Sequence, residues 1–346
     1  MRLLICTQKI DRNDPILGFF HLWVEEFSKY YEQVSVICLE KGDFNLPKNV
    51  SVYSLGKESG KSIIKYVYNF YHLIFKLRKN YDSVFVHMNP EYVCLGGLVW
   101  KFFNKKIGLW YTHREINLKL RIAEMFSDTI FTASKESFKL PSRKLQVVGH
   151  GIDTKKFPIL ISDFSLPLSI LHLGRITKIK NIEVIAQVTK NLIDNRINIK
   201  ELRLVGTPIT NEDKEYKKFL QNLFGKLNIS NLVNWDESNS DKDTFSVSTV
   251  SINSAPDGGM DKAVLASLAV EKPTFVSNQA FKNVFSEYWE MFSYPYKDSN
   301  LLTKKIENFI NLNIEEKTKI LSILGNKIRT EYGVEVLIKK IVSILK

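Results

Sequence analysis

The feature that most constrains the fold is an alternation of short β-type runs with longer amphipathic segments. The short runs are rich in Val, Ile and aromatic residues, as buried strands are. In the first half of the chain they lie at 2–6, 34–39, 83–87, 106–111, 129–133 and 145–149. Segments with helical periodicity lie between them, at 19–31, 61–79, 91–103 and 115–126. Because such alternation requires parallel strands joined by crossover helices, this half predicts a doubly wound α/β domain.

The same pattern begins again after a loop that contains Pro158 and Pro167. The strands expected here are 168–174, 201–205, 231–235, 249–254 and 273–277. The helices expected here are 181–193, 212–227, 259–270, 298–311, 314–330 and 334–346. We therefore predict two Rossmann-like domains, 1–160 and 161–330, and a C-terminal helix within 331–346 whose apolar stripe needs a partner surface. Ligands of open α/β sheets bind at the carboxyl ends of the strands, so we expect the site in a cleft between the domains.

Composition excludes several classes of protein. Hydrophobic residues make up 44% and charged residues 25%, which is ordinary for a globular chain and excludes extensive disorder. The net charge is +12; residues 1–150 contain 22 Lys and Arg against 14 Asp and Glu, and residues 151–346 contain 27 against 23. A basic surface attracts the phosphates of nucleic acids, anionic lipids and sugar nucleotides alike. A nucleic-acid binder would explain the charge but not the two-domain pattern.

Cysteine content and hydropathy bear on location. The three cysteines, Cys6, Cys38 and Cys94, lack paired spacing and lie in apolar runs, so we expect buried thiols in a reducing compartment. No apolar run reaches the roughly 18–20 residues that span a bilayer. The apolar stretch at the N-terminus is too short for a signal peptide. These observations predict a cytoplasmic protein.

The strongest candidate stretch is GRITKIKN, which follows the strand at 168–174. Gly174 permits a tight turn out of the strand, and Arg175 and Lys180 bracket that turn before a helix begins. Two cations beside a helix N-terminus form a site for a diphosphate, because the helix dipole and free N–H groups add to their charge. The alternative interpretation is a solvated basic loop.

A second candidate is the glycine-rich stretch APDGGMDK, which precedes the helix expected near Met260. Gly258 and Gly259 allow the backbone to approach a ligand closely, and the helix N-terminus points toward it. Asp257 and Asp261 could accept hydrogen bonds from sugar or ribose hydroxyls. The alternative is that Asp257 is a turn residue and Asp261 a helix-start acid.

Four shorter stretches follow expected strands of the first domain. WYTHRE places His113 after one strand end, and VHMNPEY places His87 at the end of another strand. DPILGFF places Gly18 in a loop before a helix, and VVGHGIDTKKF contains His150 after the last strand.

Together and in this order, these six stretches resemble the retaining glycosyltransferase family 4, which has the GT-B fold. The resemblance covers essentially the whole chain. GRITKIKN is similar to that family's Gly-Arg…Lys signature, and VVGHGIDTKKF to its Asn-Gly-Val/Ile-Asp…Phe turn, with His150 in the place of the asparagine. The resemblance implies glycan biosynthesis by transfer of a hexose from a nucleotide-sugar donor. It also implies that the C-terminal helix returns to the N-terminal, acceptor-side domain.

The resemblance assigns roles residue by residue. Arg175 and Lys180 would hold the donor diphosphate and, without a metal, neutralise the charge on the leaving group. His113 would donate or accept a hydrogen bond at the donor sugar, and Gly18 would bring a backbone amide to the phosphate or the acceptor. The remaining donor-binding candidates are Gly174, Asp257, Gly258, Gly259, Met260 and Asp261.

One departure from the family pattern concerns two carboxylates. The family places two glutamates, separated by seven residues, at positions that fall here on Gly258 and Ala266. We hypothesise that Asp261, or else Asp257, replaces the first. Two alternatives to an active transferase remain open: a nucleotide-sugar-binding protein that has lost turnover, and a nucleotide-sugar epimerase of the same fold.

Metal ions and partners complete the expectations. Asp241-Lys242-Asp243 has the DxD spacing of metal-dependent transferases but lies in a polar stretch typical of a solvated turn, so we expect no metal and no cofactor. The expected partners are the nucleotide-sugar donor and a glycan or lipid-linked acceptor. The basic aromatic segment 61–79 fits either peripheral contact with the inner membrane face or simple packing on a sheet.

Overall fold

The computed structural model describes residues 1–14, 16–60, 62–160, 164, 167–237 and 241–346, with only the backbone for 241–243. The chain divides into two compact units. The first unit comprises Met1–Gly151 together with Val334–Lys346, and the second comprises Ile152–Gly333. Each unit is described by itself below.

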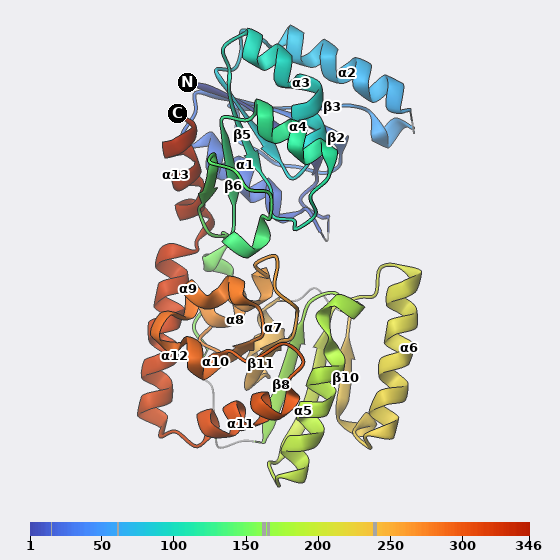
Figure 1. The fold of residues 1–346 in the computed structure, drawn as a ribbon, viewed down its shortest axis with the longest axis vertical. Coiled ribbons are helices and arrows are strands. Elements are labelled where there is room, and N and C mark those ends of the chain that lie inside the picture. The colour runs from blue at the N-terminus through green and yellow to red at the C-terminus, as the bar shows by residue number, and fades with distance from the viewer. Residues whose placement is uncertain (15, 61, 161–163, 165–166, 238–240) are drawn as a thin grey trace. The chain divides into compact units, whose positions relative to one another are not determined.

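The first unit contains a seven-stranded parallel sheet with the order β3-β2-β1-β4-β5-β6-β7 (Figure 1). Its strands are β1 (Arg2–Ile10), β2 (Gln33–Lys41), β3 (Val50–Ser54), β4 (Ser83–His87), β5 (Lys106–Trp110), β6 (Thr129–Thr132) and β7 (Leu145–Val147). Chain order reverses between β1 and β4, which are hydrogen-bonded neighbours. This is the doubly wound topology that strand–helix alternation predicts.

Helices cover both faces of this sheet. They are α1 (Phe19–Ser28), α2 (Ile63–Lys76), α3 (Pro90–Phe102), α4 (Leu118–Phe126) and α13 (Val334–Leu345). Side chains of α2, α3 and α4 share one apolar cluster with strand residues such as Val84 and Leu109. On the other face, α1 packs Phe27 against Phe85 and Trp23 against Trp110.

The C-terminal helix α13 belongs to the first unit and packs against α1 and β5. A Cβ added at Gly108 of β5 would lie 3.0 Å from the side chain of Leu345. Gly151 leaves similar room, because an added Cβ would lie 2.8 Å from the Cα of Val334 and 3.1 Å from the side chain of Leu337. The apolar stripe of α13 is therefore buried against β5 and the segment at Gly151. More than 180 positions of the chain separate α13 from both.

The second unit contains a five-stranded parallel sheet with the order β10-β9-β8-β11-β12. Its strands are β8 (Leu168–Leu173), β9 (Ile199–Val205), β10 (Val233–Asp236), β11 (Val250–Asn253) and β12 (Thr274–Val276). Its helices are α5 (Ile182–Asp194), α6 (Asn211–Lys226), α7 (Asp241–Ser246), α8 (Lys262–Ala269), α9 (Lys282–Phe285), α10 (Trp289–Phe292), α11 (Ser299–Ile310) and α12 (Ile314–Glu331). Here the chain order reverses between β8 and β11.

Three local expectations need correction. The strand β3 was not expected from the sequence, and the helix expected from 259 begins at Lys262 because Asp261 caps it. Cys94 is half-buried rather than buried, unlike Cys6 and Cys38, and all three cysteines are free. No helix within the described residues is long and apolar enough to cross a membrane.

Candidate functional site

The point where strand order reverses in the second sheet carries two of the predicted stretches. The loop Gly174–Asn181 leaves β8, and the loop Ser254–Asp261 leaves the adjacent strand β11. Loops that leave the two strands at such a point diverge to opposite faces of the sheet and leave a crevice at its carboxyl edge. Segments that are about 80 positions apart in the chain therefore meet here.

An ion pair between Lys180 and Asp261 joins the two loops. The ammonium of Lys180 contacts Oδ2 of Asp261, and both side chains are only about one-fifth exposed, at 19% and 20%. Asn253, the last residue of β11, donates to the same carboxylate oxygen at 2.9 Å. The other oxygen, Oδ1, accepts from the amide of Ala263 at 3.4 Å, so Asp261 is also the N-cap of α8.

The environment of Asp261 favours its ionised form. Burial alone would raise the pKa of Asp261, but the Lys180 charge and the hydrogen bonds from Lys180 and Asn253 outweigh it and lower the pKa below its usual value. The pair therefore presents one carboxylate that is already neutralised by one ammonium, beside the N-terminus of α8.

His172 lies in β8 beneath this pair and is fully buried. Burial and, to a smaller extent, the charge of Lys180 together lower the pKa of His172 to about 4, against an opposing effect of Asp261. Neither ring nitrogen has a hydrogen-bond partner among the described residues, and the same holds for Nδ2 of Asn181 and Oδ1 of Asn253. Buried polar atoms are rarely left unpaired, so their clustering at this edge marks it as unusual.

Two glycines bring backbone segments together at the same edge. Gly174 has a φ of +145° and Gly206, after β9, a φ of +141°, a region that disfavours any side chain. A Cβ added at Gly206 would lie 2.1 Å from the carbonyl oxygen of Gly174. The turn after β8 therefore needs glycine at position 206 as well as at position 174. The sequence does not predict this role for Gly206, because a single glycine after a strand is not a motif.

Arg175 is exposed in the loop that follows Gly174. Burial alone would raise the pKa of Asp213 in α6. A hydrogen bond from Thr177 and bonds from two backbone amides outweigh burial and lower that pKa below its usual value. The charge of Arg175 lowers the pKa of Asp213 further. The loop is thereby held against the capped start of α6, where Thr210 and Asp213 form a capping box.

The glycine-rich loop is tied to the end of β12 by two residues that the sequence did not single out. The amide of Gln279 donates to Oδ1 of Asp257 at 2.7 Å. Asn278 accepts from the amide of Gly258 at 3.3 Å and donates to the carbonyl of Gly259 at 3.0 Å. These contacts give Asp257 a structural partner, and they fix the approach of the loop to the N-terminus of α8.

Ala266 lies inside the second unit rather than at its edge. It packs in an apolar cluster with Leu171, Val205, Phe245 and Val270. A carboxylate at this position would be buried among apolar side chains, so its absence here agrees with the local packing. Met260, next to Asp261, is also buried, whereas Gly259 is exposed.

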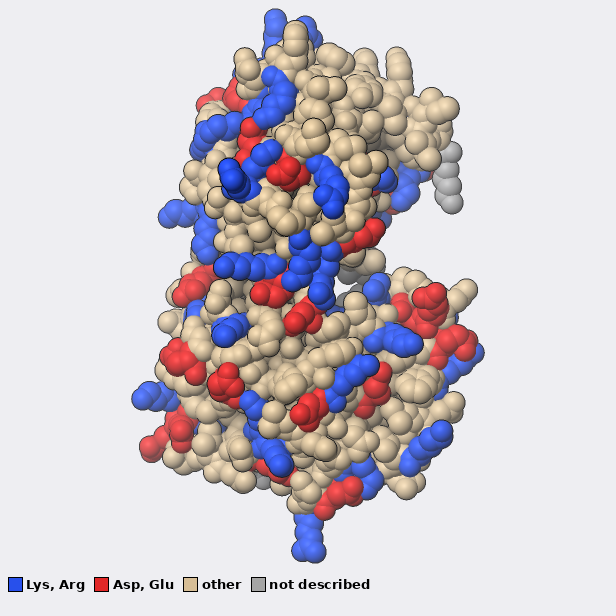
Figure 2. All heavy atoms as spheres, viewed as in Figure 1, with Lys and Arg blue, Asp and Glu red and all other residues tan. Residues whose placement is uncertain are grey.

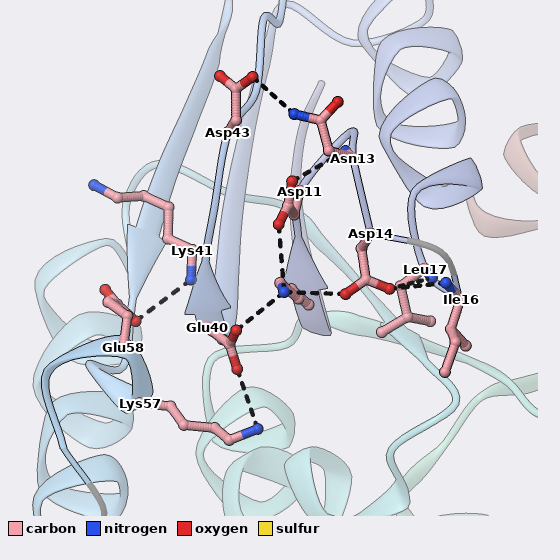
Figure 3. A network of polar contacts seen from close by, with 11 residues as sticks. Asp11, Asn13, Asp14, Ile16, Leu17, Glu40, Lys41, Asp43, Lys57 and Glu58 are labelled. Carbon is pink, nitrogen blue, oxygen red and sulfur yellow. Dashed lines mark hydrogen bonds and ion pairs between the residues drawn. The ribbon is translucent and has the colours of Figure 1, made fainter. Parts of the chain in front are cut away.

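In the first unit, the corresponding edge carries a polar network whose carboxylates Asp11, Asp14 and Glu40 are labelled in Figure 3. The ammonium of Lys9 lies 3.0 Å from Asp14, 3.0 Å from Glu40 and 3.3 Å from Asp11. Hydrogen bonds to Asp14 and then Glu40 raise the pKa of Lys9 far above its usual value. Glu40 also contacts Lys57 at 3.1 Å, so two lysines face three carboxylates.

The Lys9 network fixes the loop that contains Gly18. Oδ1 of Asp14 accepts from the amides of Leu17 and Ile16 at 2.8 and 2.9 Å, and the carbonyl of Asp14 accepts from the amide of Gly18 at 2.9 Å. A Cβ added at Gly18 would lie 2.6 Å from that carbonyl oxygen. The φ of Gly18 is −55°, which any residue can adopt. Glycine is therefore required here because a side chain would not fit, and not because the backbone is left-handed.

Three of the five histidines of the first unit lie at or after the ends of predicted strands, and they occupy different environments. His113 is exposed in the loop after β5, and its Nδ1 accepts from the amide of Glu115 at 3.2 Å. His87 is buried, stacks on Phe20 with ring centroids 4.0 Å apart, and lies 3.3 Å from the hydroxyl of Thr7. His150 is buried against Trp23 and Trp110.

The structure thus brings together Gly174, Lys180 and Asp261, and it ties the loop 257–259 to the neighbouring strand end. Gly18 and His113 belong to the other unit. The DxD sequence begins the short helix α7, and its side chains lie outside the described residues.

Comparison with known proteins identifies the architecture. No protein-family model matches the chain, and no match to a curated protein was found. Among solved structures, HepE from Anabaena in complex with UDP is 14% identical, with a TM-score of 0.76 over 100% of this chain and 99% of that one. Sucrose-phosphate synthase from Thermosynechococcus elongatus is 12% identical, with a TM-score of 0.77 over 99% and 98%. A glycosyltransferase from Rickettsia africae is 13% identical, with a TM-score of 0.74 over 99% and 97%. At these identities the likeness shows the fold, two Rossmann-like domains of the GT-B type.

Proposed function

We propose that this chain is a glycosyltransferase that moves a sugar from a nucleotide-sugar donor to a glycan or lipid-linked acceptor. The observation that carries the proposal is the Lys180–Asp261 pair at the carboxyl edge of the second sheet, beside the N-terminus of α8. Support comes from the GT-B fold and from HepE, which has the same fold and has been crystallised with UDP and with UDP-glucose.

In this proposal the second unit binds the donor diphosphate. Lys180 and the exposed Arg175 supply positive charge, and the backbone amides of the loop 257–261 and of α8 supply hydrogen-bond donors. As the bond between sugar and diphosphate breaks, these groups stabilise the negative charge that develops on the leaving oxygen. Because side chains supply the cations, we propose transfer without a metal ion and, on the resemblance to family 4, with retention of anomeric configuration.

The sugar and the acceptor contact other residues in this proposal. Asp261 accepts hydrogen bonds from the donor sugar in place of the family's first glutamate, and Asp257 holds the loop in position. His113 and the loop at Gly18 contribute from the first unit, at the donor sugar and at the phosphate or acceptor. The chain acts in the cytoplasm, peripherally bound to a membrane where its acceptor is lipid-linked.

A second candidate function is nucleotide-sugar binding without turnover. The observation that favours it is the pair of positions Gly258 and Ala266, which carry no carboxylate; Ala266 faces the apolar core of the unit. An epimerase of the same fold is a third candidate that these positions do not exclude.

One assay separates these functions. Nucleoside diphosphates that bind the native state raise its melting temperature, so a panel of them first identifies the donor base. Release of that diphosphate from the matching nucleotide sugar is then measured with and without glycan and lipid-linked acceptors. We expect release that requires an acceptor, persists in chelator, yields a product with the donor's anomeric configuration, and disappears in Lys180→Ala.

The other outcomes each contradict the proposal in a different way. Stabilisation by the diphosphate without release under any acceptor would indicate a binding protein. Formation of an isomer or of free sugar without acceptor would indicate an epimerase. Loss of release in chelator with recovery on adding magnesium or manganese would overturn metal independence.

A further inference from the structure

Helix α2 carries two apolar stripes, whereas a helix that covers a sheet needs one. The inner stripe, which includes Phe70, Leu73 and Ile74, is buried in the core of the first unit. On the opposite side, Ile64 is 84% exposed, Tyr68 is 68% exposed and Phe75 is 44% exposed. Positions 64, 68 and 75 are separated by four and seven residues, so they lie along one line of the helix surface.

The outer stripe continues onto α3. The hydroxyl of Tyr71 donates to the carbonyl of Leu95 at 3.0 Å, which holds the two helices side by side. At their C-terminal ends, the rings of Phe75 and Phe103 lie 6.3 Å apart and those of Phe103 and Phe102 lie 5.2 Å apart. On α3, Leu98 is 69% exposed and Phe102 is 81% exposed.

We call the exposed side chains Ile64, Tyr68, Phe75, Leu98 and Phe102 the α2–α3 face. Five large apolar side chains that are this exposed and this close together are unusual on a soluble protein, where exposed apolar residues are scattered singly. Figure 2 shows the corresponding part of the first unit as a largely tan surface on which red is sparse.

The charges that α2 and the turn after it contribute beside this face are all positive. Residues 62–80 contain Lys65, Lys76, Arg78 and Lys79 and no Asp or Glu. None of these four cations forms an ion pair with another described residue. By contrast, two lysines nearby on α3 and α4 are neutralised, since Lys101 pairs with Asp128 and Lys119 with Glu91.

The helical positions of the lysines place them on one flank of the stripe. At 100° per residue, positions 65 and 76 lie on one side of the line through positions 64, 68 and 75, and Lys79 follows the end of α2 at Lys76. Apolar and aromatic side chains beside a row of unpaired lysines match a surface in which acyl chains lie beneath anionic headgroups. A second copy of this face would be a poor partner, because pairing it with itself would bring like charges together.

We propose that the α2–α3 face binds the surface of an anionic membrane. The apolar side chains enter the boundary between headgroups and acyl chains, and the lysines pair with lipid phosphates. This inference rests on the proposed function, whose peripheral membrane contact it deepens by naming the surface and the lipid charge. The surface lies in the first unit and involves none of the residues proposed to bind the donor, so membrane binding can fail independently of the transfer reaction.

The test is co-sedimentation with vesicles. Wild-type protein is mixed with vesicles of phosphatidylcholine alone or of phosphatidylcholine with phosphatidylglycerol, at low and at high salt. The double variant Ile64→Ser/Phe102→Ser removes two apolar anchors, and the triple variant Lys65→Glu/Lys76→Glu/Lys79→Glu reverses the charged flank. Phe219→Ser on α6 of the second unit is the matched control, because Phe219 is also an exposed aromatic on a helix.

We expect binding to the mixed vesicles only, weakened by salt, and at least about tenfold weaker in the double and the triple variants. Phe219→Ser should bind as wild type, and the melting temperatures of all variants should stay close to that of wild type, since the substituted side chains are exposed. Equal binding by the double variant, or no binding by wild type, would overturn the proposal. A dimer that forms without lipid and is lost in the double variant would show that a second copy covers the face instead.

Discussion

The two sheets of this protein end in loops that surround one central lysine each, but with different charge around it. In the first unit, Lys9 contacts Asp11, Asp14 and Glu40 at 3.0–3.3 Å. In the second unit, Lys180 contacts one carboxylate, Asp261, and the exposed Arg175 lies in the same loop.

The difference shows that position in a doubly wound fold does not by itself make a phosphate site. Three carboxylates neutralise the charge of the lysine that they contact, and an added anion would meet net negative charge there. A lysine that faces one carboxylate, beside a helix N-terminus and a second cation, still attracts an anion. The Lys9 network therefore holds the loop at Gly18 in its conformation, and we propose that the donor diphosphate binds at the second unit.

The largest expected effect comes from the close backbone packing at the second edge. Gly206→Ala places a Cβ 2.1 Å from a backbone oxygen at a φ of +141°, whereas Gly60→Ala has the same φ and its Cβ meets no described atom within 4 Å apart from its chain neighbours. We expect a loss in the free energy of unfolding of about 3–5 kcal/mol for Gly206→Ala, from strain plus steric overlap, and of about 1 kcal/mol for Gly60→Ala, from strain alone. Denaturant titration measures both; equal losses would mean that the second edge can relax.

Acid should weaken the two edges in different pH ranges. The pKa of His172 is lowered to about 4 from an ordinary value of 6.5. The unfolded chain therefore binds this proton more readily, so the contribution of His172 to stability is complete above about pH 6.5 and is lost as the pH falls toward 4. We expect that loss to be about 3 kcal/mol in wild type and absent in His172→Leu.

The carboxylates around Lys9 are acids, and they lose their contribution to stability at a lower pH than His172 does. Hydrogen bonds to Lys9 lower the pKa of Glu40 below its usual value of 4.5, so the stability it contributes is present above that value and is lost as the pH falls through its lowered pKa. Hydrogen exchange resolved by peptide should show the second unit opening before the Lys9 loop as the pH decreases from 6.5. His72→Gln, at an exposed histidine of the first unit, is the control and should not change the profile. The same order of opening in His172→Leu as in wild type would contradict this prediction.

A smaller effect on stability, with a large one on transfer, is expected for Asp261→Asn. Asparagine can still cap α8, but it loses the charge that faces Lys180, so we expect a loss of about 1 kcal/mol in the free energy of unfolding. If Asp261 contacts the donor sugar, transfer should fall much more than stability does, because an interaction made in the transition state is lost. Measuring the melting temperature and the transfer rate together decides this; normal transfer in the variant would leave Asp257 as the next residue to test.

Much of the fold follows from periodicity. Runs such as 83–87 and 168–174 are short and largely apolar, and they coincide with β4 and β8 to within one residue. The strand β3 does not follow in this way, because Val50–Ser54 is short, alternates with serine and lies half-buried at the sheet edge. Its place depends on its pairing with β2, which is a tertiary contact.

The candidate site was predictable only in part. GRITKIKN follows a strand and precedes a helix, so the sequence locates Lys180 at a strand end. Its partner Asp261 is 81 positions away, and only the adjacency of β8 and β11 brings them together. In the same way Lys9 and Glu40 are register partners of β1 and β2, a relation that no local pattern contains. The roles of His113 and Gly18 at the donor stay predictions.

The most direct test of the central claim is calorimetric titration of UDP into wild type, Lys180→Met and Lys9→Met. Each variant removes the ammonium at the centre of one edge and leaves an apolar stem of similar length. We predict that Lys180→Met weakens UDP binding by about 1.5–3 kcal/mol, as loss of a charged hydrogen bond does, and that Lys9→Met binds UDP as wild type does. Unchanged affinity in Lys180→Met together with weakened binding in Lys9→Met would contradict the account and place the diphosphate at the first unit.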